Sequence, residues 1–279
     1  MIGIRFLVLG KNECPTTYNL QPTTYNLFKM KNNLIQYIYG IADNSLILGQ
    51  RLGELCGHGP SLETDIAMTN ISLDLFGQVR SYYQYAAKLI GGDATEDTIA
   101  FLRKEREYKN VLLVEQPNQD FAYSIARQFL FDVYHLLVLE ELQNSKDETL
   151  SAIAKKSIKE VSYHTRFSSD WIRRLGDGTE ESHNKIQTAI NDLWIFTDEL
   201  FHQTDADKAM VTEGIGVDVT LLKVNYFKKV NEILEEATLQ IPTIEYFQKG
   251  GKQGIHSEHM GYLLAQMQYM QLAYPNMNW

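Results

Sequence analysis

AIAKKSIKEVSYHTRFSSDWIRRLGDG, residues 152–178, is the stretch that decides the fold. Its small and apolar residues recur every three or four positions, so it predicts a helix with one inward-facing stripe, ended by the glycine-rich turn at 176–178. Glu160 and His164 fall on the same stripe, one helical turn apart. Because an acid and an imidazole are unfavourable inside a protein without partners, the stripe indicates an internal polar site.

A pair of metal ions is one reason for such a site. In four-helix carboxylate proteins, two metals are held by Glu-x-x-His on two helices and by one Glu on each of the other two. Here the residue three positions after Glu160 is Tyr163, and the histidine comes one position later. The spacing therefore leaves two interpretations open, a working metal site or the remains of one.

The composition limits the class of protein. The chain has 279 residues, 44% of them hydrophobic, with a formal net charge of −9. This charge argues against general nucleic-acid binding, which needs clustered Lys and Arg. Cys14 and Cys56 form no Cys-x-x-Cys motif and indicate a reducing compartment, so we expect a cytoplasmic protein. No apolar run approaches the roughly 20 residues that span a bilayer, so we expect no membrane segment.

Helical periodicity extends over most of the chain. Caps and glycine stops divide it into predicted helices at residues 31–39, 44–56, 61–89, 96–108, 116–143, 152–175, 181–202, 221–239 and 257–274. Asp43 is the expected N-cap of the second of these, and residues 205–216 are expected to form a polar loop. No stretch alternates as a strand does. The predicted fold class is therefore all-α, one domain over residues 30–279, with a long crossover between two helix pairs.

The first 29 residues differ from the rest. They contain a tandem repeat, PTTYNL at 15–20 and again at 22–27. A short repeat of this kind has no core of its own to bury. Residues 1–29 are therefore expected to be a poorly ordered or extraneous N-terminal segment.

Two more predicted helices carry polar residues on their inward faces. Asp74 lies on one of these faces, and Asp132 and His135 lie on the other. If the helices that carry Asp132 and Glu160 form an antiparallel hairpin, counting outward from the turn sets these two acids opposite each other. Facing acids repel unless a cation, a proton or a basic side chain lies between them.

The nitrogen ligands of a di-metal site are missing or displaced. Asp74 is followed at the Glu-x-x-His spacing by Gly77, and only Asp132 has a histidine three positions on, where a lone Glu is expected. The first helix offers only Glu54, far from Asp74 when counted from the turn at 57–60. We therefore assign no catalytic, cofactor-binding or metal-ligating residue. The favoured interpretation is a hydrogen-bonded polar network of Asp74, Asp132, His135, Glu160 and His164.

Three further features carry weaker signals. His256 and His259 suggest a surface metal site, although histidines at the start of a helix are more often exposed or capping. Lys249 and Lys252, with the glycines at 250–254, suggest a phosphate loop, although a hinge is the simpler interpretation. The last predicted helix has an apolar stripe, more often core, that also suits a partner's surface because Met adapts well. The stripe consists of Met260, Leu263, Leu264, Met267 and Met270.

Five long stretches look familiar when taken in order. They are LILGQRLGELCGHGPSLETDIAMTNISLDLFGQVRSYYQYA (46–86), LLVEQPNQDFAYSIARQFLFDVYH (112–135), KEVSYHTRFSSDWIRRLGDGTEES (159–182), NDLWIFTDELF (191–201) and GIHSEHMGYLLAQMQYMQLAYP (254–275). Together they closely resemble the C-subunit family of the bacterial multicomponent 1,2-phenylacetyl-CoA epoxidase, also called phenylacetyl-CoA monooxygenase. The resemblance covers nearly everything from residue 30 onward, and the segment before it is the departure.

This resemblance implies a ferritin-like four-helix bundle with additional helices, in the di-iron oxygenase superfamily. It also implies a partner, a homologous catalytic A subunit that carries the di-iron centre and binds the CoA thioester. The chain itself would hold no cofactor and would support the A subunit structurally. Other components, including an NADPH-dependent reductase, would deliver electrons, and the complex would insert one oxygen atom into the aromatic ring during aerobic phenylacetate breakdown.

Three functions compete at this point. The first is a non-catalytic structural subunit of the epoxidase, which predicts a partly apolar contact surface on the long second helix and the last helix. The second is a di-iron oxygenase or oxidase in its own right with an atypical ligand set. The third is a ferritin-like binding module for a ligand such as an acyl-CoA. Because a lost metal's charge must be replaced, the first function also predicts His⁺, Arg or Lys near Asp132 and Glu160.

Overall fold

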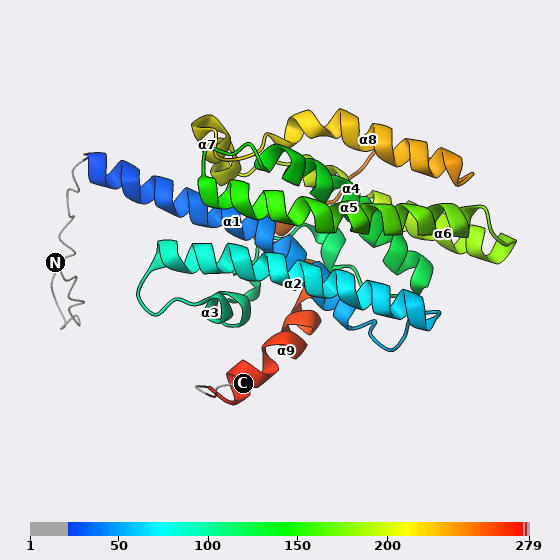
Figure 1. Ribbon diagram of the computed structural model, residues 1–279, viewed down its shortest axis with the longest axis horizontal. Helices are drawn as coiled ribbons and strands as arrows, with labels where there is room; N and C mark the ends of the chain where they lie inside the picture. The colour runs from blue at the N-terminus through cyan, green and yellow to red at the C-terminus, as the bar shows by residue number, and fades with distance from the viewer. Residues whose placement is uncertain (1–21, 276, 278–279) are drawn as a thin grey trace.

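The computed structural model describes residues 22–275 and 277, and within this part the chain is helical (Figure 1). Its α-helices are α1 (Pro22–Gly53), α2 (Leu62–Ile90), α3 (Glu96–Phe101), α4 (Phe121–Leu142), α5 (Glu148–Gly176), α6 (Glu180–Trp194), α7 (Asp205–Glu213), α8 (Val219–Glu236) and α9 (Glu258–Ala273). Short 3₁₀ turns are η1 (Glu105–Glu107), η2 (Leu112–Glu115), η3 (Asp198–Phe201) and η4 (Gly251–Gln253).

Two helix hairpins form the bundle. α1 packs along α2, α4 packs along α5, and α2 contacts α5 to join the two pairs. The segment between α2 and α4 is the predicted long crossover, and it carries α3, η1 and η2. α6 and α8 cover α4 from the outside, α7 packs on α1, and α9 projects from the body of the bundle (Figure 1). The architecture is the all-α ferritin-like bundle that the sequence predicts.

α4 is the central helix, and its composition explains why. Its side chains are apolar on nearly every face, and the helix is buried almost throughout. The carboxylate of Asp120 caps its first turn by accepting the Tyr123 N–H at 2.8 Å. α5, in contrast, buries one stripe and exposes its Lys and Glu side chains. The polar residues on α4 are therefore deep in the protein, whatever their charge.

The first helix differs from the prediction. The sequence predicts two helices with Asp43 as the cap between them, but α1 is continuous through this position. The Asp43 carboxylate does not turn back onto its own helix, because three groups from other segments bind it. Arg103 donates from Nη2 at 2.6 Å and from Nη1 at 2.9 Å, and the Tyr83 hydroxyl and the Lys109 N–H also donate to it.

Three other predicted elements also differ from those in the structure. The predicted loop at 205–216 contains α7, whose start is a capping box between Thr204 and Asp207 and whose end is Gly214 with φ 72°. Only Met210 of this helix is buried, so its apolar periodicity is weak and the capping box is the signal that predicts it. The helix predicted at 181–202 ends at Trp194 and resumes as η3, and the one predicted at 96–108 ends at Phe101.

The N-terminal prediction lies mostly outside the described residues. Within them, residues 22–29 form the first turns of α1, and the described side chains from 26 to 30 are exposed. The expected boundary at Met30 does not interrupt the helix. None of the helices in the described part of the chain is long and apolar enough to cross a membrane.

Candidate functional site

The predicted polar residues meet at the centre of the bundle, where α2, α4 and α5 face one another. α2 supplies Asp74, α4 supplies Asp132 and His135, and α5 supplies Glu160 and His164. The periodicity therefore placed all five on inward or half-inward faces. The structure divides them into separate hydrogen-bonded groups and does not gather them into one cluster.

Asp132 is the most deeply buried acid of this centre, with an exposed fraction of 0%. Its Oδ2 accepts the Ser168 hydroxyl at 2.8 Å, and its Oδ1 accepts the Gln128 amide at 2.6 Å. Burial raises the pKa of Asp132 to about 8, although both hydrogen bonds act to lower it. The carboxyl group therefore holds its proton near neutral pH, and no formal charge has to be balanced beside it.

The two histidines are buried in different ways. His164 Nε2 lies 3.0 Å from Asp74 Oδ2, and burial lowers the pKa of His164 although Asp74 acts against this shift. His135 has no hydrogen-bond partner at either ring nitrogen among the described residues. Burial, with a smaller effect from His164, lowers the pKa of His135 to about 3. His135 is therefore a neutral imidazole, with one unmatched donor and one unmatched acceptor.

Glu160 has an amide partner and no cation among its described contacts. The Gln78 side chain on α2 donates to Glu160 Oε2 at 3.0 Å, which links α2 to α5. The helical periodicity of the sequence also places Gln78, Gln128 and Ser168 on inward faces, but nothing in their spacing assigns them as partners of the acids. A face can be predicted from periodicity, whereas the partner across the bundle depends on the packing of two helices.

Two predictions about this centre are wrong. Asp132 does not lie opposite Glu160, because its carboxylate binds Ser168 and its main-chain carbonyl accepts the Thr165 hydroxyl at 3.3 Å. Counting from the turn fails because the structure sets Asp132 against Thr165 and Ser168, five and eight residues beyond Glu160 on α5. The predicted replacement cation is also absent from the described contacts of Asp132 and Glu160, because a retained proton and amide donors take its place.

The donor set does not fit a pair of metal ions. Both oxygens of Asp132 accept hydrogen bonds from other side chains, Asp74 is paired with His164, and Glu160 accepts an amide. Across the part of the chain that the structure describes, no three His, Cys, Asp or Glu side chains are grouped to hold a metal ion. Glu54, the acid of the first helix, binds Arg51 at 3.0 Å instead.

One histidine of the last loop, His256, pairs with an internal acid. His256 Nδ1 lies 3.0 Å from Glu115 Oε2, and its Nε2 lies 3.1 Å from the Tyr108 carbonyl. Burial lowers the pKa of His256, but the hydrogen bond and charge of Glu115 more than offset this effect, and the net shift is upward. His256 thus ties the loop before α9 to the crossover, and it does not share a site with His259.

The glycine-rich loop at 250–254 also binds an internal acid. The N–H of Gly250 donates to Glu199 Oε1 at 2.7 Å, and the N–H of Leu112 donates to Glu199 Oε2 at 2.7 Å. Glu199 is buried, so the anion recognised by this loop is a side chain of the protein. Of the apolar stripe on α9, Met260, Leu263 and Leu264 belong to the core, whereas Met270 is exposed.

Replacing His135 with Leu is expected to raise the free energy of unfolding by about 1–3 kcal/mol, because it removes two buried polar atoms that have no partner. Urea denaturation at pH 7 measures the change. His164→Leu is the matched control, since it breaks the hydrogen bond to Asp74 and is expected to give no gain. A destabilised His135→Leu variant would show that the imidazole contributes a contact that stabilises the fold.

The fold and the centre define a class of protein: a ferritin-like helical bundle whose inward acids are held by hydrogen bonds to other side chains of the bundle. The family model described as "Phenylacetic acid catabolic protein" matches residues 18–279. The chain is also 49% identical over 248 residues to the C subunit of the 1,2-phenylacetyl-CoA epoxidase of Escherichia coli strain K12, covering 89% of this chain and 100% of that protein. The chain therefore belongs to the phenylacetic acid catabolic protein family, and the resemblance seen in its sequence is confirmed.

Proposed function

We propose that this chain is a structural, non-catalytic subunit of a phenylacetyl-CoA epoxidase. In this role it pairs with a catalytic A subunit that holds the di-iron centre, and it acts in aerobic phenylacetate catabolism in the cytoplasm. Other components of the complex, including an NADPH-dependent reductase, supply the electrons. The observation that carries this proposal is the 49% identity to the E. coli protein, the C subunit of its epoxidase, over the whole length of that protein.

The polar centre supports the absence of iron from this chain. A di-iron site needs ionised carboxylates that are free to bridge metals, together with two imidazoles at Glu-x-x-His spacing. Here burial favours the neutral form of Asp132, and the imidazole of His164 is held by Asp74. The acids and the imidazole of His164 are thus used within the fold, and we propose that the metals belong to the partner.

The exposed face of α2 supports the pairing. Leu62, Ile66 and Leu73 lie at positions i, i+4 and i+11, so they share one side of the helix, and they are 71%, 50% and 61% exposed. α9 adds exposed apolar side chains at Tyr262 and Tyr269. Exposed apolar side chains arranged along one helix face favour a protein–protein contact over isolated surface residues. We propose these two helices as the contact with the A subunit.

Co-purification tests the structural role. The chain and the A subunit from the same genome are expressed together, with an affinity tag on the A subunit only. We expect the two chains to elute as one complex in size-exclusion chromatography. Elution of this chain alone, with the A subunit separate and soluble, would contradict the pairing.

A single charge on α2 tests the contact surface. Leu73→Asp is expected to weaken association with the A subunit by about tenfold or more, because it buries an unpaired carboxylate in the interface. Leu221→Asp on α8 is the control, since Leu221 is also exposed, at 74%, and α8 lies on a different side of the bundle (Figure 1). Biolayer interferometry gives both Kd values, and equal weakening by the two variants would remove α2 from the interface.

Iron analysis tests the non-catalytic role separately. The chain purified without its partner, after reconstitution with ferrous iron, is expected to retain less than stoichiometric metal and to leave phenylacetyl-CoA unchanged when a reductant and oxygen are supplied. Near-stoichiometric iron with turnover would favour the other candidate, a di-iron oxygenase or oxidase with an atypical ligand set.

A further inference from the structure

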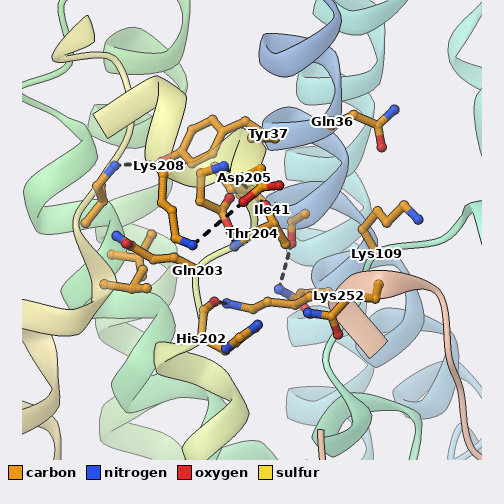
Figure 2. A pocket seen from close by; sticks show the side chains of 18 of the residues that line it. Gln36, Tyr37, Ile41, Lys109, His202, Gln203, Thr204, Asp205, Lys208 and Lys252 are labelled. Carbon is orange, nitrogen blue, oxygen red and sulfur yellow. Dashed lines mark hydrogen bonds and ion pairs between the residues drawn. The ribbon is translucent and has the colours of Figure 1, made fainter. Parts of the chain in front are cut away.

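A cavity of about 510 Å³ opens beside the polar centre, on the side of α1, α4 and α7 (Figure 2). Its volume falls within the range of about 300–1,000 Å³ that is typical of small-molecule sites. α1 contributes Tyr37, Gly40 and Ile41, and α4 contributes Phe131, Tyr134, His135 and Val138. The segment leading into α7 closes one side, and Lys252 of η4 reaches the same space. This site shares only His135 with the centre described above.

The body of the cavity is apolar and rich in aromatic rings. Phe131, Tyr134 and Tyr37 line it together with Val138, Val217 and Val219. The Tyr37 hydroxyl already accepts the Val217 N–H at 2.9 Å. These side chains offer little to a strongly hydrated molecule, and they suit an aromatic ring or a short alkyl chain.

Two buried polar side chains on this cavity have hydrogen-bonding capacity to spare. His135, with an exposed fraction of 3%, has no partner at either ring nitrogen among the described residues. Lys252, 9% exposed, donates to the carbonyls of Leu200 at 3.0 Å and His202 at 2.8 Å, and Figure 2 shows it extending toward His202. An ammonium group has three N–H donors, so one donor of Lys252 is not used by these contacts.

The charges of Glu199 and Asp207 act on Lys252, but no carboxylate among the described residues accepts a hydrogen bond from its ammonium group. Glu199, the buried acid near Lys252, accepts hydrogen bonds from the N–H groups of Leu112 and Gly250. The Asp207 carboxylate accepts the Thr204 N–H at 2.8 Å, and Asp205 is fully exposed beside Lys208. Each acid is thus satisfied within the fold or hydrated. The buried polar groups with unused hydrogen-bonding atoms on this cavity are therefore the ammonium group of Lys252, with one spare donor, and the imidazole of His135.

We propose that this cavity binds a small organic anion, a carboxylate with an aromatic or aliphatic body. The body lies against Phe131, Tyr134 and Tyr37, and the carboxylate accepts from Lys252 and from the N–H of His135. The charge-assisted bond gives the site its preference for an anion, since a neutral amide of the same shape accepts a weaker hydrogen bond from the ammonium group than a carboxylate does. This activity is separate from the proposed structural role, because it needs only the isolated chain.

A matched pair of ligands tests the charge. Isothermal titration calorimetry of the purified full chain is performed with 4-phenylbutyrate and with 4-phenylbutanamide, which keep the same body and differ in charge. We expect saturable 1:1 binding of the carboxylate with a Kd of about 1 mM or tighter, and at least tenfold weaker binding of the amide. No saturable binding of the carboxylate at 10 mM (roughly ten times that Kd), or equal binding of the two compounds, would overturn the proposal.

A matched pair of protein variants tests the location. Gly40 lies on the cavity wall, and a Cβ added there meets no heavy atom within 4 Å, so we expect the side chain of Gly40→Leu to occupy part of the cavity. Gly77 on α2 is equally open and lies away from the cavity, so Gly77→Leu is the control. We expect Gly40→Leu to weaken 4-phenylbutyrate binding at least tenfold and Gly77→Leu to leave it unchanged. Unchanged binding by Gly40→Leu, at an unchanged thermal midpoint, would contradict the assigned site.

Discussion

Replacing Asp43 with Ala is expected to lower the free energy of unfolding by about 3–5 kcal/mol, because it leaves the charge of Arg103 buried without its partner. The Asp43 side chain is 0% exposed and the Arg103 side chain is 9% exposed. The guanidinium binds the carboxylate through two nitrogens and lies between the rings of Tyr39 and Tyr108, with distances of 4.4 and 4.2 Å to their centroids. Among the described contacts of Arg103, Asp43 supplies the only carboxylate.

Urea denaturation at pH 7 measures this loss. Lys185→Ala is the control, because it breaks an exposed Lys185–Glu181 pair and is expected to leave stability nearly unchanged. The variant that combines Asp43→Ala with Arg103→Ala should be less destabilised than the sum of its parts, since it removes both charges. A loss below about 1 kcal/mol for Asp43→Ala would show that the buried ion pair does not hold α1 to the crossover.

Replacing Asp132 with Asn is expected to stabilise the protein at pH 8 and to leave it nearly unchanged at pH 4. Burial raises the pKa of Asp132 from an ordinary 3.8 to about 8. Between these values the folded state holds the proton and the unfolded state releases it, so the free energy of unfolding falls by about 1.4 kcal/mol per pH unit as pH rises. Above about pH 8 both states are ionised and the loss stops growing.

The Asn side chain keeps the shape of the protonated acid and removes the titration. Its amide can donate to the Gln128 Oε1, which has no partner among the described residues. The expected gain at pH 8 is on the order of 3–5 kcal/mol, with urea denaturation at pH 4, 6, 7 and 8 as the measurement. Asp170→Asn, which alters an exposed acid paired with Arg173, is the control. Parallel pH profiles of the wild type and Asp132→Asn would show that Asp132 is ionised in the folded protein.

The amino-acid sequence by itself determined the fold class, most helix positions and the faces that point inward. Apolar spacing identified α2, α4 and α5. The cap residue Ser61 and the stop residue Gly91 mark the two ends of α2, as predicted. These features are local, because periodicity and capping involve residues within a few positions of one another. The same local signal placed the five polar residues of the centre on their faces. The helices predicted at 61–89 and 257–274 are accordingly confirmed to within one residue at each end, as α2 and α9.

The tertiary structure decided which side chains meet. Asp43 binds Arg103 sixty positions later, and Glu199 binds the loop at Gly250. Asp132 binds Ser168 in place of facing Glu160, because the packing of α4 against α5, and not the length of their turn, decides which residues lie opposite each other. The charge of a buried acid likewise depends on its surroundings in three dimensions. Desolvation, and no neighbouring cation, holds the proton on Asp132.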